Sequence, residues 1–429
     1  MKIAIYLNNQ NISEVNCVDM TVGNPGIGGT EYCFLLLAQM YKKCYPENKV
    51  ILITNKQAAL PTVDQLLFAK DVFEGAETAK KENADIFLIS AVDQGSPLPK
   101  TFFDIINRIE LKTIIWGHNF YLSNFCNMLS KCNYVRANVF VGRQQYDRYI
   151  DHKIIKKSTY IYNMYPANDG PVREKKNTNN VTYVGSLVPM KGFQVLAKAW
   201  KQVIEKVPDA QLYVIGSGKL YGRNSKLGKY NIAEQEYENS FIDGLLDENG
   251  KIMSSVHFLG VMGAEKKDII LRTAVGVPNP TGRTETFGIS ALDFESLGVP
   301  VVTIAKDGFL DTVVNHETGL LYSDPKYLAE NIVTLLLNKT MNEGYGKKGV
   351  QFSKSFDPEI IIQEWNQLFW DVSNERSIEF RDPENFMDSN LKKYRWCNRK
   401  IKNRLHFEYP ISVIGIETIA RKLLRVLGK

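Results

Sequence analysis

Short apolar runs separated by helical or polar segments recur along this chain, and this alternation constrains its fold more than any other feature. The first half holds six such runs, at residues 2–7, 50–54, 85–90, 113–117, 138–142 and 158–163. Most of them are apolar at nearly every position, which is typical of parallel strands buried on both faces. The alternation therefore predicts a doubly wound α/β domain.

The same pattern returns after residues 167–180, a stretch rich in Asn, Lys, Pro and Gly that has no apolar period. The later runs lie at residues 180–185, 211–216, 256–260, 275–280, 299–304 and 319–322. We therefore predict two Rossmann-like domains, 1–166 and 181–355, joined by a linker at 167–180. Large α/β proteins bind ligands at the carboxyl ends of their strands, so two such domains imply a ligand cleft.

A polar stretch at 217–251 separates the second and third strands of the later domain. It is longer than a plain crossover requires. The sequence leaves two interpretations open, a lid or specificity insert and a solvated excursion.

Composition excludes several classes of protein. The chain has 429 residues, of which 44% are hydrophobic, and no run approaches the roughly 18 apolar residues of a membrane-spanning helix. The residues after Met1 alternate like a strand and lack the features of a signal peptide. The six cysteines form no C-x-x-C pair and have no nearby His cluster, which disfavours a disulfide framework and a zinc site. We expect a cytoplasmic protein with reduced thiols and no metal.

Charge is concentrated at the C-terminal end. Residues 391–429 hold 11 Lys or Arg against two Glu, which leaves 42 basic and 45 acidic residues in 1–390. The body of the chain therefore gives no electrostatic argument for nucleic-acid binding. We expect no nucleic-acid partner, and an anionic one for the tail.

The first candidate site is a glycine-rich segment before a predicted helix. Gly28 and Gly29 would let backbone N–H groups approach a phosphate or sugar, and Thr30 can cap the helix. A dinucleotide fingerprint would require a third glycine where Glu31 stands, which disfavours an NAD-dependent dehydrogenase. A flexible glycine turn is the alternative.

The second candidate is Lys191, which with Gly192 follows the first strand of the later domain. A Lys at the carboxyl edge of a parallel sheet, beside the N–H groups of a helix start, suits a diphosphate. An ordinary surface Lys before a helix is the alternative.

The third candidate, within 279–302, is the most informative. Glu285 precedes a glycine turn, and a helix that starts there carries Asp293. Carboxylates accept hydrogen bonds from sugar and ribose hydroxyls, so the two acids can address different parts of one ligand. Three backbone N–H groups at the helix start can face a phosphate, those of Phe287, Gly288 and Ile289. A capping or solvated acid pair is the alternative.

His118 stands just past the end of a predicted buried strand in the first domain. A His at this position can hydrogen-bond a sugar or assist a proton transfer. A structural histidine is the alternative.

Taken together, these segments resemble the retaining glycosyltransferases of family four, the glycosyl transferases group 1. The resemblance covers residues 1–372, is most specific at 279–302, and implies a GT-B fold, with two Rossmann-like domains around a donor and acceptor cleft. It implies that Glu285 holds the transferred sugar and Asp293 the nucleotide ribose. It also implies that Gly28 and Gly29 lie in a loop bordering donor and acceptor, and that His118 lies near the sugar. Lys191 and Gly192 would form the diphosphate site.

The chain departs from the family pattern at two positions. Many members carry Arg where this chain has Ser186, so a diphosphate cation is either absent or supplied elsewhere, for example by Arg283 or Arg223. We still expect Ser186 among the donor-binding residues, together with Thr30 and Arg283. The second acid is Asp293 where Glu is usual, one methylene shorter.

The implied activity is transfer of a hexosyl or N-acetylhexosaminyl unit from a nucleotide diphosphate sugar, UDP-linked by expectation. The acceptor would be a saccharide or lipid-linked saccharide in surface polysaccharide synthesis, of capsule or lipopolysaccharide. The nucleotide sugar is a substrate, and no cofactor is implied. A sugar-nucleotide 2-epimerase of similar outline and a non-catalytic sugar-binding protein remain the alternatives.

The C-terminal end adds two features. Residues 356–372 predict a crossover helix that returns to the first domain. In the basic tail, 373–429, a helix carries one apolar side with Arg421, Lys422 and Arg425 beside it, and this side comprises Ile416, Ile419, Leu423 and Leu427. Such a helix can lie on an anionic membrane surface as a peripheral anchor or pack on the body, and the sequence leaves both open.

Overall fold

The structure, a computed structural model, describes residues 1–166, 170, 172, 179–218, 226–383 and 391–426. Contacts divide the chain into two units. The first comprises Met1–Met20, Thr30–Met164 and Glu359–Lys429, and the second comprises Thr21–Gly29 and Tyr165–Pro358. The division differs from the predicted domain 1–166 because residues 21–29 group with the second unit, where Pro25 and Gly26 lie beside Val261–Gly263.

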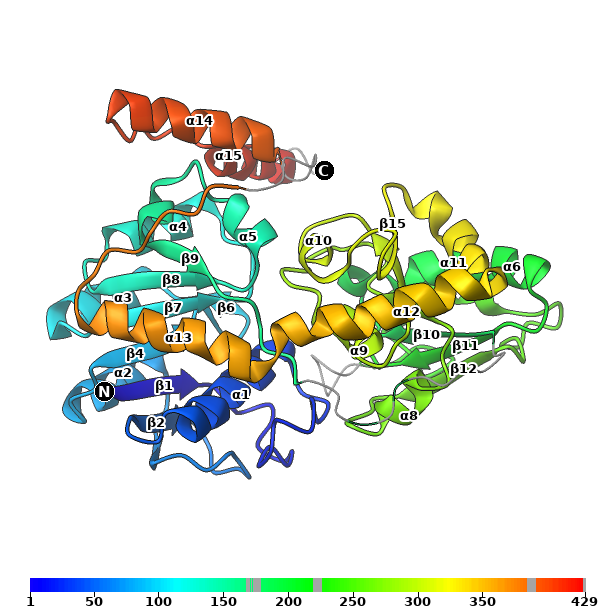
Figure 1. The fold of residues 1–429 in the computed structure, drawn as a ribbon, viewed down its shortest axis with the longest axis horizontal. Helices are drawn as coiled ribbons and strands as arrows, with labels where there is room; N and C mark the ends of the chain where they lie inside the picture. The colour runs from blue at the N-terminus through cyan, green and yellow to red at the C-terminus, as the bar shows by residue number, and fades with distance from the viewer. Residues whose placement is uncertain (167–169, 171, 173–178, 219–225, 384–390, 427–429) are drawn as a thin grey trace. The chain divides into compact units, whose positions relative to one another are not determined.

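The first unit is built on a seven-stranded parallel sheet in the order β3-β2-β1-β4-β7-β8-β9. Its strands are β1 (Lys2–Leu7), β2 (Lys49–Thr54), β3 (Gln65–Phe68), β4 (Ile86–Ser90), β7 (Thr113–Gly117), β8 (Val135–Phe140) and β9 (Ser158–Tyr160) (Figure 1). A two-stranded hairpin, β5 (Val92–Asp93) and β6 (Ser96–Pro97), stands apart. The run predicted at 138–142 lies three residues too late, because β8 begins at Val135.

Helices cover both faces of this sheet. They are α1 (Gly29–Cys44), α2 (Val72–Lys81), α3 (Lys100–Ile109), α4 (Ser123–Lys131), α5 (Arg143–Asp147), η1 (Lys153–Lys157) and α13 (Pro358–Ser373). Ala4 and Tyr6 of β1 pack in a cluster with residues of α2, α3 and α4. Helix α13 packs against α1 and β7, since the Tyr41 hydroxyl donates to Asn366 at 2.8 Å and the rings of Trp116 and Trp365 lie 4.6 Å apart.

The second unit has a six-stranded parallel sheet in the order β12-β11-β10-β13-β14-β15. The strands are β10 (Asn180–Val184), β11 (Gln211–Ile215), β12 (Val256–Gly260), β13 (Val275–Pro278), β14 (Val301–Ile304) and β15 (Gly319–Tyr322). The longer helices are α6 (Phe193–Lys206), α7 (Gln235–Phe241), α9 (Ile289–Glu295), α11 (Leu328–Leu337) and α12 (Lys339–Ser353). The shorter ones are η2 (Pro189–Lys191), η3 (Ile242–Leu245), α8 (Lys266–Ile270), α10 (Phe309–Thr312), η4 (Pro325–Tyr327) and η5 (Lys354–Phe356).

The described part of the stretch 217–251 packs onto the second sheet. Tyr237 and Phe241 of α7 are buried in the same cluster as Phe193 and Trp200 of α6. The buried Glu238 accepts hydrogen bonds from the N–H groups of the preceding loop, including that of Tyr230 at 2.8 Å. This part is therefore a folded insert and not a solvated excursion; residues 219–225, with Arg223, lie outside the described residues, as does most of the linker.

Both sheets share one strand order. In the first sheet β2 and β3 lie on one side of β1, and β4 lies on its other side. In the second sheet β11 and β12 lie on one side of β10, and β13 lies on its other side. This is the order of the Rossmann fold, in which ligands bind outside the carboxyl ends of the strands where the order reverses. The predicted doubly wound architecture is therefore confirmed, and the reversal points lie at β1/β4 and at β10/β13.

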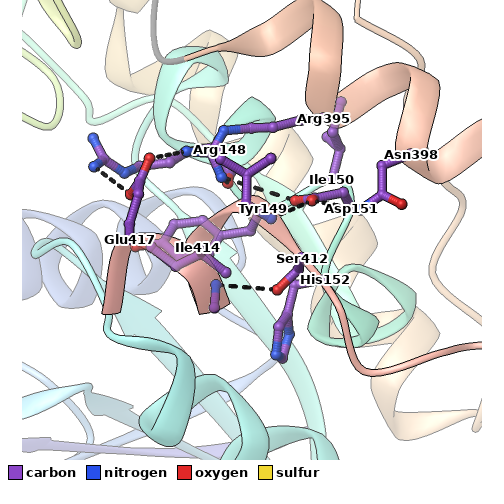
Figure 2. A network of polar contacts seen from close by, with 12 residues as sticks. Arg148, Tyr149, Ile150, Asp151, His152, Arg395, Asn398, Ser412, Ile414 and Glu417 are labelled. Atoms are coloured by element: carbon purple, nitrogen blue, oxygen red, sulfur yellow. Dashed lines mark hydrogen bonds and ion pairs between the residues drawn. The ribbon is translucent and has the colours of Figure 1, made fainter. Parts of the chain in front are cut away.

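The C-terminal segment packs on the first unit through α14 (Lys392–Leu405) and α15 (Val413–Val426). Arg395 is fully buried and donates to the carbonyl of Arg148 at 2.7 Å, and it pairs with Asp151 and Glu417 (Figure 2). Arg399 donates to the carbonyl of Ile150 at 2.6 Å. The basic residues of α14 thus satisfy carbonyl groups just after α5. Leu427 lies outside the described residues.

Candidate functional site

Lys191 and Glu285 meet at the carboxyl edge of the second sheet. Lys191 follows β10 and Glu285 follows β13, and these strands are neighbours at the reversal point. The Lys191 Nζ lies 2.9 Å from Glu285 Oε2, and the two side chains are 22% and 12% exposed. The structure therefore brings the predicted diphosphate cation and the predicted sugar acid together.

The turn that carries Lys191 is held from inside the sheet. The hydroxyl of Tyr183, a residue of β10, donates to the Lys191 carbonyl at 2.9 Å. Gly192 follows at φ 72°, and a Cβ there would lie 2.7 Å from Thr281 Cγ2 in the loop after β13. Only glycine fits this left-handed position and this close approach, so the two loops are fixed against each other.

Glu285 is kept ionised by its neighbours. Burial alone would raise its pKa, but the Lys191 ammonium and hydrogen bonds from Lys191 and Asn279 bring it below its ordinary value. The Asn279 amide donates to Glu285 Oε2 at 3.1 Å. An ionised, partly exposed carboxylate at this edge is a strong acceptor for ligand hydroxyl groups.

Asp293 on α9 also forms an ion pair with a lysine. Lys266, at the start of α8, lies 2.8 Å from Asp293 Oδ2, and the Tyr165 hydroxyl donates to Oδ1 at 3.2 Å. Sequence reasoning named neither Lys266 nor Tyr165. Lys266 and Lys267 follow β12 as Lys191 follows β10. A cation shortly after a strand end is therefore the sequence feature that could have indicated Lys266.

Ser186 lies directly after β10 and Gly185 and is 3% exposed. Its Oγ has no hydrogen-bond partner among the described residues. A buried hydroxyl without a partner is uncommon in folded proteins, and at this edge it suits an atom of a bound ligand. From the sequence we expect Ser186 among the donor-binding residues but without the cation that many family members have here, and its buried hydroxyl is compatible with that role.

At the start of α9, one of the three N–H groups expected to face a phosphate has a partner within the protein. Helix α9 begins at Ile289 after Gly288, whose φ is 87°, and the Gly288 N–H is directed at the Glu285 carboxylate instead of an open phosphate position. The Phe287 ring packs against Phe356 at 5.4 Å, which fixes the turn. Arg283 is exposed; its carbonyl accepts a hydrogen bond from the Asn279 amide at 3.0 Å, and its backbone N–H donates to the Thr281 hydroxyl at 3.3 Å.

The glycine-rich loop is ordered by Asn24, whose Oδ1 accepts from the Ile27 N–H at 2.8 Å. Helix α1 begins at Gly29, so Thr30 lies in its first turn and does not cap it. A Cβ at Gly29 would meet nothing within 4 Å.

His118 follows β7 in the first unit, as predicted, and its ring lies 4.6 Å from that of Trp116. Burial lowers the pKa of His118 to about 3, although a hydrogen bond with Asn163 acts in the opposite direction. The ring is therefore neutral at pH 7 and suits a hydrogen bond better than proton transfer.

Two further features concern the residues that the structure describes. No helix there is both long enough and apolar enough to cross a bilayer. Within the same residues, His, Cys, Asp and Glu form no group of three that could hold a metal ion.

Comparison with known proteins finds relatives of the second part of the chain. Residues 166–352 match the model of the glycosyl transferases group 1. Over 44% of its length the chain is 28% identical to the D-inositol 3-phosphate glycosyltransferase of Corynebacterium efficiens, covering 42% of that protein. It is 29% identical to the capsular polysaccharide biosynthesis glycosyltransferase CapM of Staphylococcus aureus, over 44% of this chain and 45% of CapM. The matches thus span less than half the length of these relatives.

The fold extends over more of the chain than the sequence similarity does. The crystal structure of Anabaena Alr3699/HepE in complex with UDP-glucose superimposes with a TM-score of 0.62 at 13% identity, covering 86% of this chain and 99% of that one. Together with the two Rossmann-type sheets, this likeness identifies the fold class. The chain has the GT-B fold, and its residues 166–352 match the family model of the glycosyl transferases group 1.

Proposed function

We propose that this protein is a retaining glycosyltransferase that moves a hexosyl or N-acetylhexosaminyl unit from a UDP-linked sugar to a saccharide or lipid-linked saccharide. The observation that carries the proposal is the Lys191–Glu285 pair at the reversal point of the second sheet. Nucleotides bind at this place in Rossmann-type sheets, and a cation beside a carboxylate matches a ligand with both phosphates and hydroxyls.

Lys191 would act on the leaving group. When the bond between the anomeric carbon and the diphosphate oxygen breaks, negative charge develops on the diphosphate. A cation already held at the sheet edge stabilises that charge more than it stabilises the ground state, which lowers the barrier. The buried Ser186 hydroxyl would donate a hydrogen bond to the same diphosphate.

The two acids would bind hydroxyl groups. Glu285 is ionised, and once Lys191 turns to the diphosphate its oxygens accept hydrogen bonds from the sugar. Asp293, positioned by Lys266 and Tyr165, would accept from the ribose. The neutral His118 would hydrogen-bond the transferred sugar, the role that the family resemblance gives it.

The names of similar proteins support the substrate class. CapM takes part in capsular polysaccharide biosynthesis, and Alr3699/HepE was crystallised with UDP-glucose. We propose a role in surface polysaccharide synthesis, with the nucleotide sugar as substrate and with no cofactor or metal needed for the transfer.

Lys191→Ala tests the proposal. Removing a donor that stabilises developing negative charge costs about 3–4 kcal/mol of barrier, so turnover should fall by two to three orders of magnitude. The control is Lys198→Ala, because Lys198 is an exposed lysine of α6 in the same unit. Near-normal turnover in Lys191→Ala, with unfolding temperatures alike in both variants, would refute the role.

The donor and the reaction type are identified by two further measurements. A sugar nucleotide at 100 times its dissociation constant adds about 2.7 kcal/mol to stability, so a thermal-shift screen will rank donors. Product analysis with donor alone separates a transferase from a 2-epimerase, because only the epimerase converts the nucleotide sugar without an acceptor. A non-catalytic binding protein would shift in the screen and give no product in either assay.

A further inference from the structure

Helix α14 buries four basic side chains and exposes three large apolar ones. Its basic side chains at 392, 395, 399 and 402 are at most 3% exposed and face the first unit. A neighbouring, exposed side carries Tyr394, Ile401 and Leu405, which are 66%, 52% and 60% exposed. These three lie at i, i+7 and i+11, on one side of a helix with 3.6 residues per turn. A helix that buries basic side chains while its large apolar side chains stay exposed needs an explanation.

Helix α15 repeats the pattern. It contacts the first unit through Ile414 and Thr418, which are 2% and 7% exposed. Ile416, Ile419 and Leu423 lie on another side and are 58%, 60% and 58% exposed. The helix therefore packs without using its main apolar stripe. Phe407, in the connection between the helices, is 63% exposed.

The charges on the exposed side have one sign. The two acids of residues 391–426 are turned toward buried or neighbouring cations: Glu408 pairs with Arg399 and Lys156, and Glu417 pairs with Arg395 and Arg148. The exposed charged residues of the two helices are Lys393, Lys400, Arg404, Arg421 and Lys422. Of these, Lys400 has a nearby acid, Asp382 at 3.4 Å.

We propose that the exposed apolar stripes of α14 and α15, with the basic residues beside them, form a docking surface for an anionic lipid bilayer. Apolar side chains enter the boundary between headgroups and acyl chains, and basic side chains meet the lipid phosphates. Charge complementarity selects this occupant: a second copy docked by the same face would bring the basic residues against their equivalents.

The surface deepens the proposed function without depending on it. It would hold the enzyme at a membrane, where lipid-linked acceptors are found. Vesicle binding requires no sugar nucleotide, so a failure of the docking proposal and a failure of the donor chemistry are separate results.

The test is flotation of the full chain with two kinds of vesicle. One contains phosphatidylcholine alone, and the other also contains about 30% phosphatidylglycerol, which makes the surface anionic. We expect binding to the anionic vesicles, weakened by salt, and little binding to the neutral ones. Ile419→Ser/Leu423→Ser should weaken binding by about tenfold or more, and Arg421→Glu/Lys422→Glu by about thirtyfold or more.

Matched controls come from the same chain. Leu337→Ser/Ile360→Ser removes two apolar side chains that are 63% and 52% exposed elsewhere, and Lys80→Glu/Lys81→Glu reverses an exposed basic pair at the end of α2. Both should bind vesicles as the unchanged protein does. Equal binding by test and control variants would overturn the proposal. So would the absence of vesicle binding together with a dimer, seen by size-exclusion chromatography, that the tail variants dissociate.

Discussion

Glu285→Gln is expected to change UDP affinity and turnover in opposite directions. In the unliganded protein the Lys191 ammonium lies 2.9 Å from the Glu285 carboxylate. A diphosphate must take that ammonium away from Glu285 before it can bind. Glutamine keeps the shape of the side chain but competes weakly for the cation, so UDP should bind more tightly. Turnover with the UDP-sugar should fall, because the charged acceptor for the sugar hydroxyls is lost.

The size of the effect follows from the exposure of the pair. Exposed ion pairs contribute up to about 1 kcal/mol, and hydrogen bonds to charged groups in more protected places contribute about 1.5–3 kcal/mol. With side chains 22% and 12% exposed, this pair lies between the two classes. We take about 1–2 kcal/mol, which corresponds to UDP binding about 5- to 30-fold tighter.

Isothermal titration calorimetry with UDP measures the affinity directly. Glu317→Gln is the control, because Glu317 lies 3.2 Å from Lys348 in an ion pair whose side chains are both 56% exposed in the same unit. Its UDP affinity should stay within about twofold of the unchanged protein. If Glu285→Gln weakens UDP binding as Lys191→Ala does, then Glu285 does not compete with the diphosphate, and the assignment of the two side chains is wrong.

Two further predictions concern stability. Glu295 is fully buried, and burial raises its pKa well above the ordinary value, although a hydrogen bond from Thr318 opposes this shift. Because the folded pKa is the higher one, stability is greatest below the ordinary value of about 4.3 and falls as pH rises toward the folded pKa. At pH 8 the free energy of unfolding of Glu295→Gln, measured by urea denaturation, should therefore exceed that of the unchanged protein by about 1–3 kcal/mol. This difference should shrink toward pH 4; a difference that does not depend on pH would contradict the reasoning. Arg395→Met should destabilise the attachment of α14 by about 3–5 kcal/mol, since the buried Asp151 loses this cation and Glu417 keeps only Arg148, and limited proteolysis between 391 and 426 should accelerate; unchanged cleavage would contradict it.

The strands were the most predictable part of this molecule. The runs at 2–7, 113–117, 256–260 and 319–322 coincide residue for residue with β1, β7, β12 and β15. A strand buried on both faces must be apolar throughout, so its limits are visible in the sequence. Strand β3 was missed because it lies at the sheet edge, where alternate residues are exposed.

The candidate site could be predicted only in part. Lys191 and Glu285 follow strands whose carboxyl ends share an edge, so their meeting was predictable from strand order. Tyr165 was not, because nothing local to it signals a partner 128 residues away. The buried cations of α14 were not either, because a Lys- and Arg-rich helix ordinarily turns its charges to water. Here they are drawn inward by backbone carbonyls after α5, which no sequence pattern reveals.

The hydrogen bond from Tyr183 to the Lys191 carbonyl has a thermodynamic consequence. A strand residue fixes the turn before any ligand arrives, so the conformational entropy of that turn is lost when the chain folds and not when the nucleotide binds. Tyr183→Phe would return that freedom to the empty turn. Its calorimetric signature would be a more unfavourable entropy of UDP binding, with the Lys191 ammonium still present to meet the phosphates.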